Sequence, residues 1–199
     1  MELFQLAGII QGNIPTRIEA NAGKISDNIE TITMQELNYV ANISDEIPTA
    51  KFLMVQSDKL DSLAITQEND VVVSLSSGTA IVIDSSRANK LILSNLAIVR
   101  IKNKDIVDPH YLCWYISNKI SEIRKMQQGT YAVSIIPISV LKNFEVTLLP
   151  IVKQRLIGNI YELKRKRDRL TKTIENKKSK VLSQKLLQVF AMEAKDGSQ

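Results

Sequence analysis

The chain has 199 residues, of which 44% are hydrophobic and 24% are charged, and its formal net charge is +5. This composition suffices for one globular domain with a core and excludes wholesale disorder. No apolar run reaches membrane-spanning length and neither terminus resembles a secretory signal, so we expect a cytoplasmic protein with no membrane role.

Charge is distributed unevenly along the chain. Residues 1–84 carry four Lys or Arg against twelve Asp or Glu, a balance of −8. Residues 85–150 hold nine against four, a balance of +5, and residues 151–199 hold thirteen against five, a balance of +8. Such a basic end indicates a nucleic-acid or other acidic partner, but a solvated lysine-rich helix face explains it equally well.

Short strands are predicted through the middle of the chain. Residues 70–77 and 80–83 are rich in Val and Ile on either side of a Ser-Gly-Thr turn, and residues 91–101 are apolar around a polar pair. Residues 144–149 alternate apolar and polar side chains, the period of a half-buried strand. The stretch ETITMQEL, residues 30–37, is a further candidate strand between turns.

One helix is predicted between these strands. Asp108 is suited to cap it and Pro109 to its first turn, where a missing N–H costs little. The helix ends near Met126, and its apolar face is formed by Leu112, Ile116, Ile120 and Ile123. Mixed strands with a packed helix predict an α+β or α/β globular domain over residues 1–150, and we take α+β as the fold class.

After Pro150 the hydrophobic period becomes that of a coiled coil. Arg167 and Lys177 occupy two places of the apolar seam, and no Gly or Pro interrupts residues 159–190. Such a stripe needs a partner helix, so we predict a dimerisation helix over residues 151–190 and a disordered tail at 191–199. The apolar seam residues are Leu156, Ile160, Leu163, Leu170, Ile174 and Val181.

Catalytic patterns are scarce. There is a single histidine, His110, for which a capping or solvent-facing role is expected, and a single cysteine, Cys113, which is expected in the core. One His and one Cys do not make a closed zinc site, and no nucleophile elbow or phosphate-binding glycine loop occurs. We therefore predict a non-catalytic binder with no cofactor and no metal.

Polar turn residues are the candidates for DNA contacts, because Arg, Lys, Asn and Gln pair with base edges while hydroxyls and amides hold phosphates. They fall in three loops, each of which alone is a weak signal. The predicted contacts are Ser76, Ser77, Gly78 and Thr79 in the first loop, Arg87, Asn89 and Lys90 in the second, and Lys125, Gln127, Gln128, Gly129, Thr130 and Tyr131 in the third.

An ordered series of motifs over residues 70–190 resembles the DNA-specificity subunits of type I restriction–modification systems. NDVVVSLSSGTAIV resembles their "GDI(L/V)(V/L)S..GT.G" stretch, and DPHYLCWYISNK resembles their "(D/N)..YL.Y.L.S" helix. QQGTYAVSIIPISVLKNFEVTLLPIVKQRLI is similar to the ending that leads into their conserved helix.

The resemblance implies a half-length form, because the usual subunit has two target-recognition domains and two helices that pair antiparallel as a spacer. It implies double-stranded DNA, the methyltransferase (modification) subunit and the restriction subunit as partners. The chain would position these subunits on a bipartite site and catalyse nothing itself.

Several alternatives stay open. The helix would pair with a second copy of the chain, giving a homodimer, or with a different half subunit. A coiled-coil scaffold protein without DNA reading is also consistent with the sequence. A nuclease using the triplets Glu162-Leu163-Lys164 or Glu175-Asn176-Lys177 would lack a nearby strand-borne acid.

Overall fold

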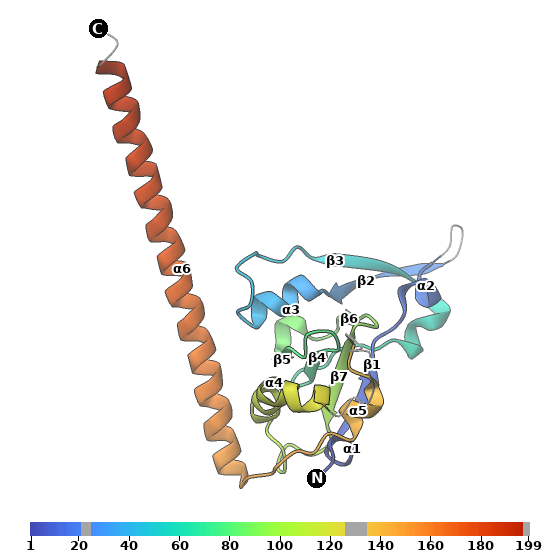
Figure 1. The fold of residues 1–199 in the computed structure, drawn as a ribbon. Coiled ribbons are helices and arrows are strands. Elements are labelled where there is room, and N and C mark those ends of the chain that lie inside the picture. The colour runs from blue at the N-terminus through green and yellow to red at the C-terminus, as the bar shows by residue number, and fades with distance from the viewer. Residues whose placement is uncertain (21–24, 126–134, 197–199) are drawn as a thin grey trace. The chain divides into compact units, whose positions relative to one another are not determined.

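A computed structural model describes residues 1–20, 25–125 and 135–196. It confirms the predicted α+β class with a long C-terminal helix (Figure 1). The elements are, in chain order, α1 (Leu3–Leu6), β1 (Ala7–Gln11), α2 (Pro15–Ile18), β2 (Ser26–Ile32), α3 (Met34–Val40), β3 (Lys51–Gln56), the 3-10 helix η1 (Ser57–Ser62), β4 (Val71–Ser74), β5 (Ala80–Val82), the 3-10 helix η2 (Ser85–Arg87), β6 (Leu91–Ile92), β7 (Leu96–Ile101), α4 (Pro109–Lys125), α5 (Ile138–Lys142) and α6 (Ile151–Asp196).

The chain forms two compact units, Met1–Glu162 and Leu163–Gln199. The first, called the head below, contains both sheets and the beginning of α6. The second is the remainder of α6, called the rod below. The sequence predicted the division at residue 150, where α6 begins, and the structure assigns the first turns of that helix to the head.

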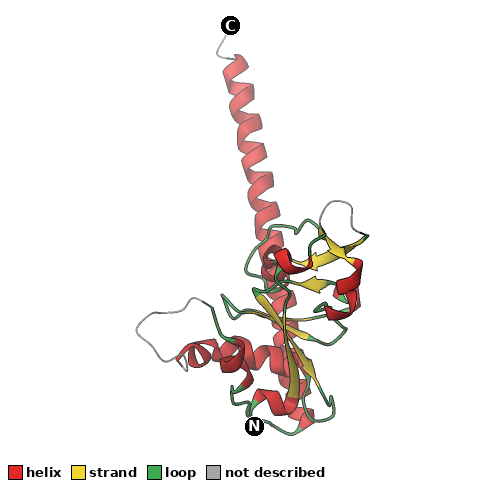
Figure 2. Ribbon diagram, turned by 90° about the vertical axis from the view of Figure 1, so that its right-hand side faces the viewer, coloured by secondary structure: helices red, strands yellow, loops and turns green. Residues whose placement is uncertain are grey.

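A four-stranded antiparallel sheet of order β1-β7-β4-β5 forms the centre of the head (Figure 2). Both of its faces are buried. Val71 and Val73 belong to the core that includes Leu112 of α4, whereas Val72 points the other way, into the core that includes Leu37 of α3. Burial on both faces explains why β4 is a run of valines rather than an alternating strand.

A smaller sheet of order β3-β2-β6 lies beyond α3 (Figure 1). β2 pairs with β3 in antiparallel fashion and with β6 in parallel fashion. Its inner side contributes Val55 and Leu91 to a third, smaller core together with Ile18. This sheet is built mainly from the acidic N-terminal part of the chain.

The structure corrects three of the predicted strands. Residues 91–101 are two strands, β6 and β7, because the polar pair within them forms a turn. Residues 144–149 are extended but make only an isolated bridge, Glu2↔Glu145, although their predicted alternation of burial is correct. Residues 30–37 begin as β2 and continue into α3, which Thr33 caps. Sequence patterns report which side chains are buried more directly than which backbone groups pair.

α4 agrees with its prediction where the structure describes it. Asp108 Oδ1 accepts a hydrogen bond from Tyr111 N at 2.9 Å, as an N-cap should, and Pro109 is the first helical residue. Leu112 and Ile116 are fully buried, and so is Cys113. Ile120 and Ile123 lie among side chains that the structure does not describe.

The first turns of α6 are locked into the head by Gln154 and Gly158. Gln154 is fully buried; its Oε1 accepts a hydrogen bond from Asp108 N at 3.0 Å, and its Nε2 donates to Ile106 O and Leu149 O at 2.9 and 2.7 Å. A Cβ on Gly158 would lie 2.8 Å from His110 Cβ, so only glycine allows this approach. His110 therefore lies at this joint, with its Nδ1 3.5 Å from Glu162 Oε1.

Replacing Gln154 by alanine should lower the free energy of unfolding of the head by about 2–3 kcal/mol, because buried polar groups around it lose their partners. Urea unfolding followed by the fluorescence of Trp114, the single tryptophan, reports on the head directly. Arg155→Ala, at the exposed neighbouring position, is the control and should leave the midpoint unchanged. Equal effects of the two substitutions would contradict a specific lock at Gln154.

The rod presents its apolar seam to solvent. Leu163, Leu170, Ile174 and Val181 are between 51% and 65% exposed, although residues of this type are normally buried. α6 continues to Asp196, beyond the helix end predicted at residue 190. A 46-residue helix is about 70 Å long, and an isolated helix does not bury such a stripe on its own.

Candidate nucleic-acid interface

The first predicted loop is a tight turn between β4 and β5. Gly78 has a φ of 74°, in the left-handed region that favours glycine, and its N donates to Ser74 O at 2.8 Å. The buried Ser74 Oγ accepts a hydrogen bond from Ser77 N at 3.1 Å, while Ser77 Oγ donates to Thr79 Oγ1 at 2.9 Å. The turn is therefore held in one conformation, with the side chains of Ser76 and Ser77 exposed.

A hollow of about 310 Å³ adjoins this turn. Its lining carries hydroxyl and small apolar groups and no charged side chain, so it suits a neutral polar group better than a phosphate. It lies within the head and is lined by Ala41, Ile43, Ser77, Gly78, Thr79, Ala80, Ser117 and Tyr161.

The second predicted loop follows β5 and is fixed by the buried Thr66. Thr66 Oγ1 donates to Arg87 O at 2.8 Å and accepts from Lys90 N at 3.0 Å, and Asn89 N donates to Thr66 O at 2.8 Å. Asn89 has a φ of 63°, a left-handed conformation that asparagine tolerates better than most residues, and its side chain is exposed. Asp84 caps the preceding 3-10 helix, since its Oδ1 accepts from Arg87 N at 3.1 Å.

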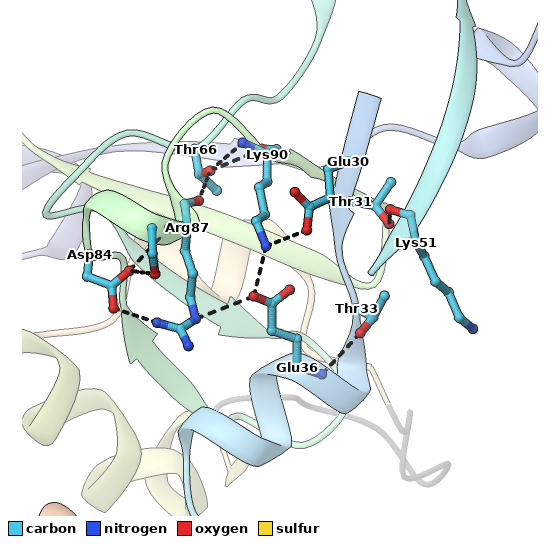
Figure 3. Close-up of polar contacts among 10 residues, drawn as sticks. Glu30, Thr31, Thr33, Glu36, Lys51, Thr66, Asp84, Arg87 and Lys90 are labelled. Carbon is cyan, nitrogen blue, oxygen red and sulfur yellow. Dashed lines mark hydrogen bonds and ion pairs between the residues drawn. The ribbon is translucent and has the colours of Figure 1, made fainter. Parts of the chain in front are cut away.

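The two cations of this loop are engaged with carboxylates of the N-terminal region (Figure 3). Lys90 Nζ lies 2.7 Å from Glu30 Oε1 and 3.1 Å from Glu36 Oε1. Arg87 pairs with Asp84, and its Nε lies 3.4 Å from Glu36 Oε1, in an ion pair without hydrogen-bond geometry. The side chains of Lys90 and Glu36 are each only 12% exposed. The cluster links β2, α3 and the 84–90 loop, and its charges are largely neutralised within the head.

Glu36 is the shared carboxylate of this cluster, so Glu36→Ala should lower the free energy of unfolding by about 2 kcal/mol. The loss arises because Arg87 and Lys90, both mostly buried, would keep only Asp84 and Glu30 as partners. Glu68→Ala removes an exposed carboxylate and should have almost no effect. Urea unfolding monitored at Trp114 measures both, and a stable Glu36→Ala head would show that the cluster contributes nothing.

The cluster also predicts a pH dependence. Burial by itself lowers the pKa of Lys90, but the hydrogen bonds and negative charges of Glu30 and Glu36 outweigh it and raise that pKa above 10.5. The resulting stabilisation is fully present below the pKa of an unfolded lysine and is lost as the pH rises through the folded value. The difference in unfolding free energy between wild type and Lys90→Gln should thus stay constant near neutral pH and shrink in alkali, and urea unfolding at a series of pH values measures it.

The third predicted loop lies mostly outside the described residues. α4 ends at Lys125, whose side chain is not described, and Gln127, Gln128, Gly129, Thr130 and Tyr131 fall in the undescribed range 126–134. The chain continues beside the first loop, because Ile136 N donates to Leu75 O at 2.7 Å. The first and second loops lie at opposite ends of β5.

Sequence reasoning missed the acids of the ion-pair cluster. Glu30 and Glu36 belong to a different part of the chain from Lys90, and no local pattern connects them. The one local signal is the spacing of Asp84 and Arg87, three residues apart as in a capped turn. Within residues 1–20, 25–125 and 135–196, no group of His, Cys, Asp and Glu is arranged to hold a metal ion. No helix in the described part of the chain is both long and apolar enough to cross a bilayer.

Comparison with known proteins gives a match in structure only. No family model matches the sequence, and no curated protein sequence matches it. The fold matches the HsdS subunit from Thermoanaerobacter tengcongensis, with a TM-score of 0.55 and 18% identity over 86% of this chain. It also matches the type I restriction–modification S subunit from M. genitalium, with a TM-score of 0.52 and 16% identity over 84% of this chain.

A third match is a chain of a type I R-M system whose structure concerns complex assembly and conformational transition, with a TM-score of 0.60 and 11% identity over 86% of this chain. The fold is that of half a type I specificity subunit. The chain spans only 38–43% of the length of these three solved chains. At sequence identities this low, the structural matches show a shared fold. The predicted resemblance to specificity subunits is confirmed at the level of the fold.

Proposed function

We propose that this chain is the DNA-recognition subunit of a type I restriction–modification system and has no catalytic activity of its own. The observation that carries the proposal is the fold shared with specificity subunits over most of this chain and less than half of theirs. The head would read one half of a bipartite DNA site, and α6 would connect it to a second reading head through another helix. That helix would come from a second copy of the chain or from a different half subunit.

The proposed DNA contacts differ in whether their side chains would have to rearrange before they touch DNA. Ser76 and Ser77 are exposed on a preformed turn, so their hydroxyls and nearby backbone groups would meet DNA without rearrangement. Asn89 offers an exposed amide of the type that pairs with adenine. Arg87 and Lys90 would have to leave Glu36 to bind DNA, so we propose that they mainly hold the loop in place. The remaining proposed contacts are Gly78, Thr79, Lys125, Gln127, Gln128, Gly129, Thr130 and Tyr131.

Methylome sequencing of cells with and without this chain tests the proposal. We expect one interrupted methylated motif to disappear when the chain is deleted and to return with the wild-type chain. Replacing Ser76, Ser77 and Asn89 together by alanine should abolish or change the motif, whereas Lys59→Ala and Glu68→Ala, both at exposed sites, should restore it unchanged. A methylome that is identical with and without the chain would refute the proposal.

The partner proteins would be the modification subunit, which carries the methyltransferase chemistry, and the restriction subunit. Electrophoretic binding assays with the purified chain and its modification subunit should show preference for DNA carrying the methylated motif. Equal affinity for scrambled DNA at matched salt would count against sequence reading, since phosphate contacts alone give affinity without specificity.

A second candidate is a coiled-coil scaffold protein without DNA reading. The neutralised cations at Arg87 and Lys90 favour it, because they leave the second loop with little positive potential. On this alternative the triple alanine variant described above would keep full biological activity, while substitutions in the rod would abolish it.

A further inference from the structure

The positions beside the apolar seam of the rod carry lysine and no acid. In the heptad defined by Leu163, Leu170, Ile174 and Val181, two flanking positions per heptad border the seam, one on each side. From Lys164 to Leu187 every charged flanking residue is a lysine, and each of these side chains is exposed. These residues are Lys164, Lys166, Lys178, Lys180 and Lys185, and the other flanking positions hold Thr171, Thr173 and Leu187.

The seam itself is also cationic. Arg167 and Lys177 occupy two of its core places, and of these Arg167 is paired with Asp168 at 2.7 Å. The nearest acids along the helix, Asp168 and Glu175, lie at heptad positions outside both the seam and its flanks. The surface that would meet a partner helix is therefore apolar in its centre and positive at its edges.

Two copies of this surface would not be complementary in charge. Flanking residues of paired helices face one another in both parallel and antiparallel coiled coils, and their charges select the partner. Between two copies of this rod, every charged flanking contact would join lysine to lysine. Apolar burial would still favour pairing, but no flanking contact would add to it and several would oppose it.

We propose that the seam of α6 binds an acidic amphipathic helix of a different chain, with Asp or Glu at the positions flanking its own apolar stripe. The inference rests on the proposed function, in which α6 joins two heads, and it selects a different half subunit over a second copy. Charge complementarity along the seam is the basis of this choice. Leu163 and Leu170, 65% and 63% exposed, favour a helix over nucleic acid, because phosphates would not cover them.

A charge-reversed copy of the chain tests the proposal in the full-length protein. Changing Lys164, Lys166, Lys178 and Lys180 to Glu turns the rod into the acidic-seam partner that the wild type should prefer. By sedimentation equilibrium, a mixture of wild type and reversed chain should form a one-to-one pair at concentrations roughly tenfold or more below those at which wild type self-associates. Raising the salt concentration should weaken the mixed pair and strengthen the wild-type pair, since it screens both attraction and repulsion.

The matched control changes the same number of lysines on the head. Lys51, Lys59, Lys104 and Lys142 are exposed, and replacing them by Glu gives the same net charge without altering the rod. Wild type mixed with this control should pair no better than wild type alone. If the control pairs as tightly as the reversed chain, net charge and not the seam is responsible, and the proposal is overturned.

A variant with uncharged side chains at the same positions keeps the proposal testable if the charge-reversed rod does not fold. With the same four rod lysines changed to Gln, self-association should become stronger than that of wild type, because the repulsion is removed. The proposal is overturned if wild type self-associates as tightly as the neutral variant does and as tightly as it binds the charge-reversed chain. It is also overturned if double-stranded DNA fully displaces the charge-reversed chain from the seam. Loss of the methylated motif is measured separately, so a rod that pairs as expected without directing methylation would refute the proposed function alone.

Discussion

Replacing Asp70 by alanine should lower the free energy of unfolding of the head by about 3 kcal/mol. The Asp70 side chain is only 3% exposed and binds Arg100 with both oxygens, at 2.9 Å to Nε and 2.7 Å to Nη2. It also accepts a hydrogen bond from Gln67 N at 2.7 Å. Without the carboxylate, the partly buried guanidinium of Arg100, 31% exposed, and the amide of Gln67 lose their acceptor, and of the bonds described for the Arg100 side chain only the one to Ile65 O at 2.9 Å remains.

The rod contains a control of the same chemistry. Arg167 and Asp168 also form an Arg–Asp pair at 2.7 Å, but their side chains are 71% and 45% exposed. Asp168→Ala should therefore change stability by less than about 0.5 kcal/mol. Both proteins are compared by urea unfolding at Trp114. A loss below about 1 kcal/mol for Asp70→Ala would mean that the pair is no stronger than an exposed one.

Gly12→Ala should destabilise the head by about 3 kcal/mol or more, because the added methyl group has no room. A Cβ at this position would lie 2.1 Å from Leu93 O and 2.8 Å from Ile92 O, so backbone rather than a flexible side chain would have to move. Gly12 N donates to Leu96 O of β7, in the four-stranded sheet, and Asn13 N donates to Ile92 O of β6, in the smaller sheet, each at 3.0 Å. The substitution would thus disturb the place where the chain leaves β1 and reaches the smaller sheet.

Gly8, within β1, provides the matched comparison for Gly12, which follows the end of that strand. A Cβ there would meet nothing nearer than Arg100 O at 4.0 Å, so Gly8→Ala should be neutral or slightly stabilising. The thermal unfolding midpoints of the two variants, again followed by Trp114 fluorescence, should therefore move in opposite directions or differ widely. Equal midpoints would show that the backbone near Leu93 yields more easily than its contacts imply.

Both sites support the surface proposed to read DNA. Asp70 precedes β4 and pairs with a residue of β7, so it anchors the strand that ends in the 74–79 turn. Gly12 lets β1 approach the turn between β6 and β7, next to Asn95, whose backbone oxygen accepts from Leu75 N at 2.9 Å. The turn is consequently supported from within the sheet, which is how a rigid scaffold positions a recognition loop.

Local patterns predicted the two long helices, α4 and α6, well. α4 follows from a capping aspartate, a proline in its first turn and one apolar face, all of which are properties of consecutive residues. The same holds for α6, whose start after Pro150 and whose seam are visible in the residue order. Predictions succeeded where the decisive contacts are a few residues apart.

Contacts between segments far apart in the chain were harder to predict from the sequence. Residues 144–149 have the alternation of a strand, yet they belong to neither described sheet, and their backbone pairs with the chain start through Val146 N→Met1 O at 2.8 Å and the Glu2 bridge. Arg87 and Lys90 have the chemistry of DNA contacts, but Glu36, about fifty positions earlier, occupies them. A partner so distant leaves no signal in the residues around the cation.

The sequence by itself determined the α+β class, the long helix, its unpartnered seam and the lysines that border it, because helix periodicity places these side chains without reference to the rest of the molecule. Only the tertiary structure decided which charges the head satisfies internally, how Gln154 and Gly158 join the helix to the head, and why Gly12 must be glycine. Those features depend on segments brought together by burial, and burial is a property of the whole fold.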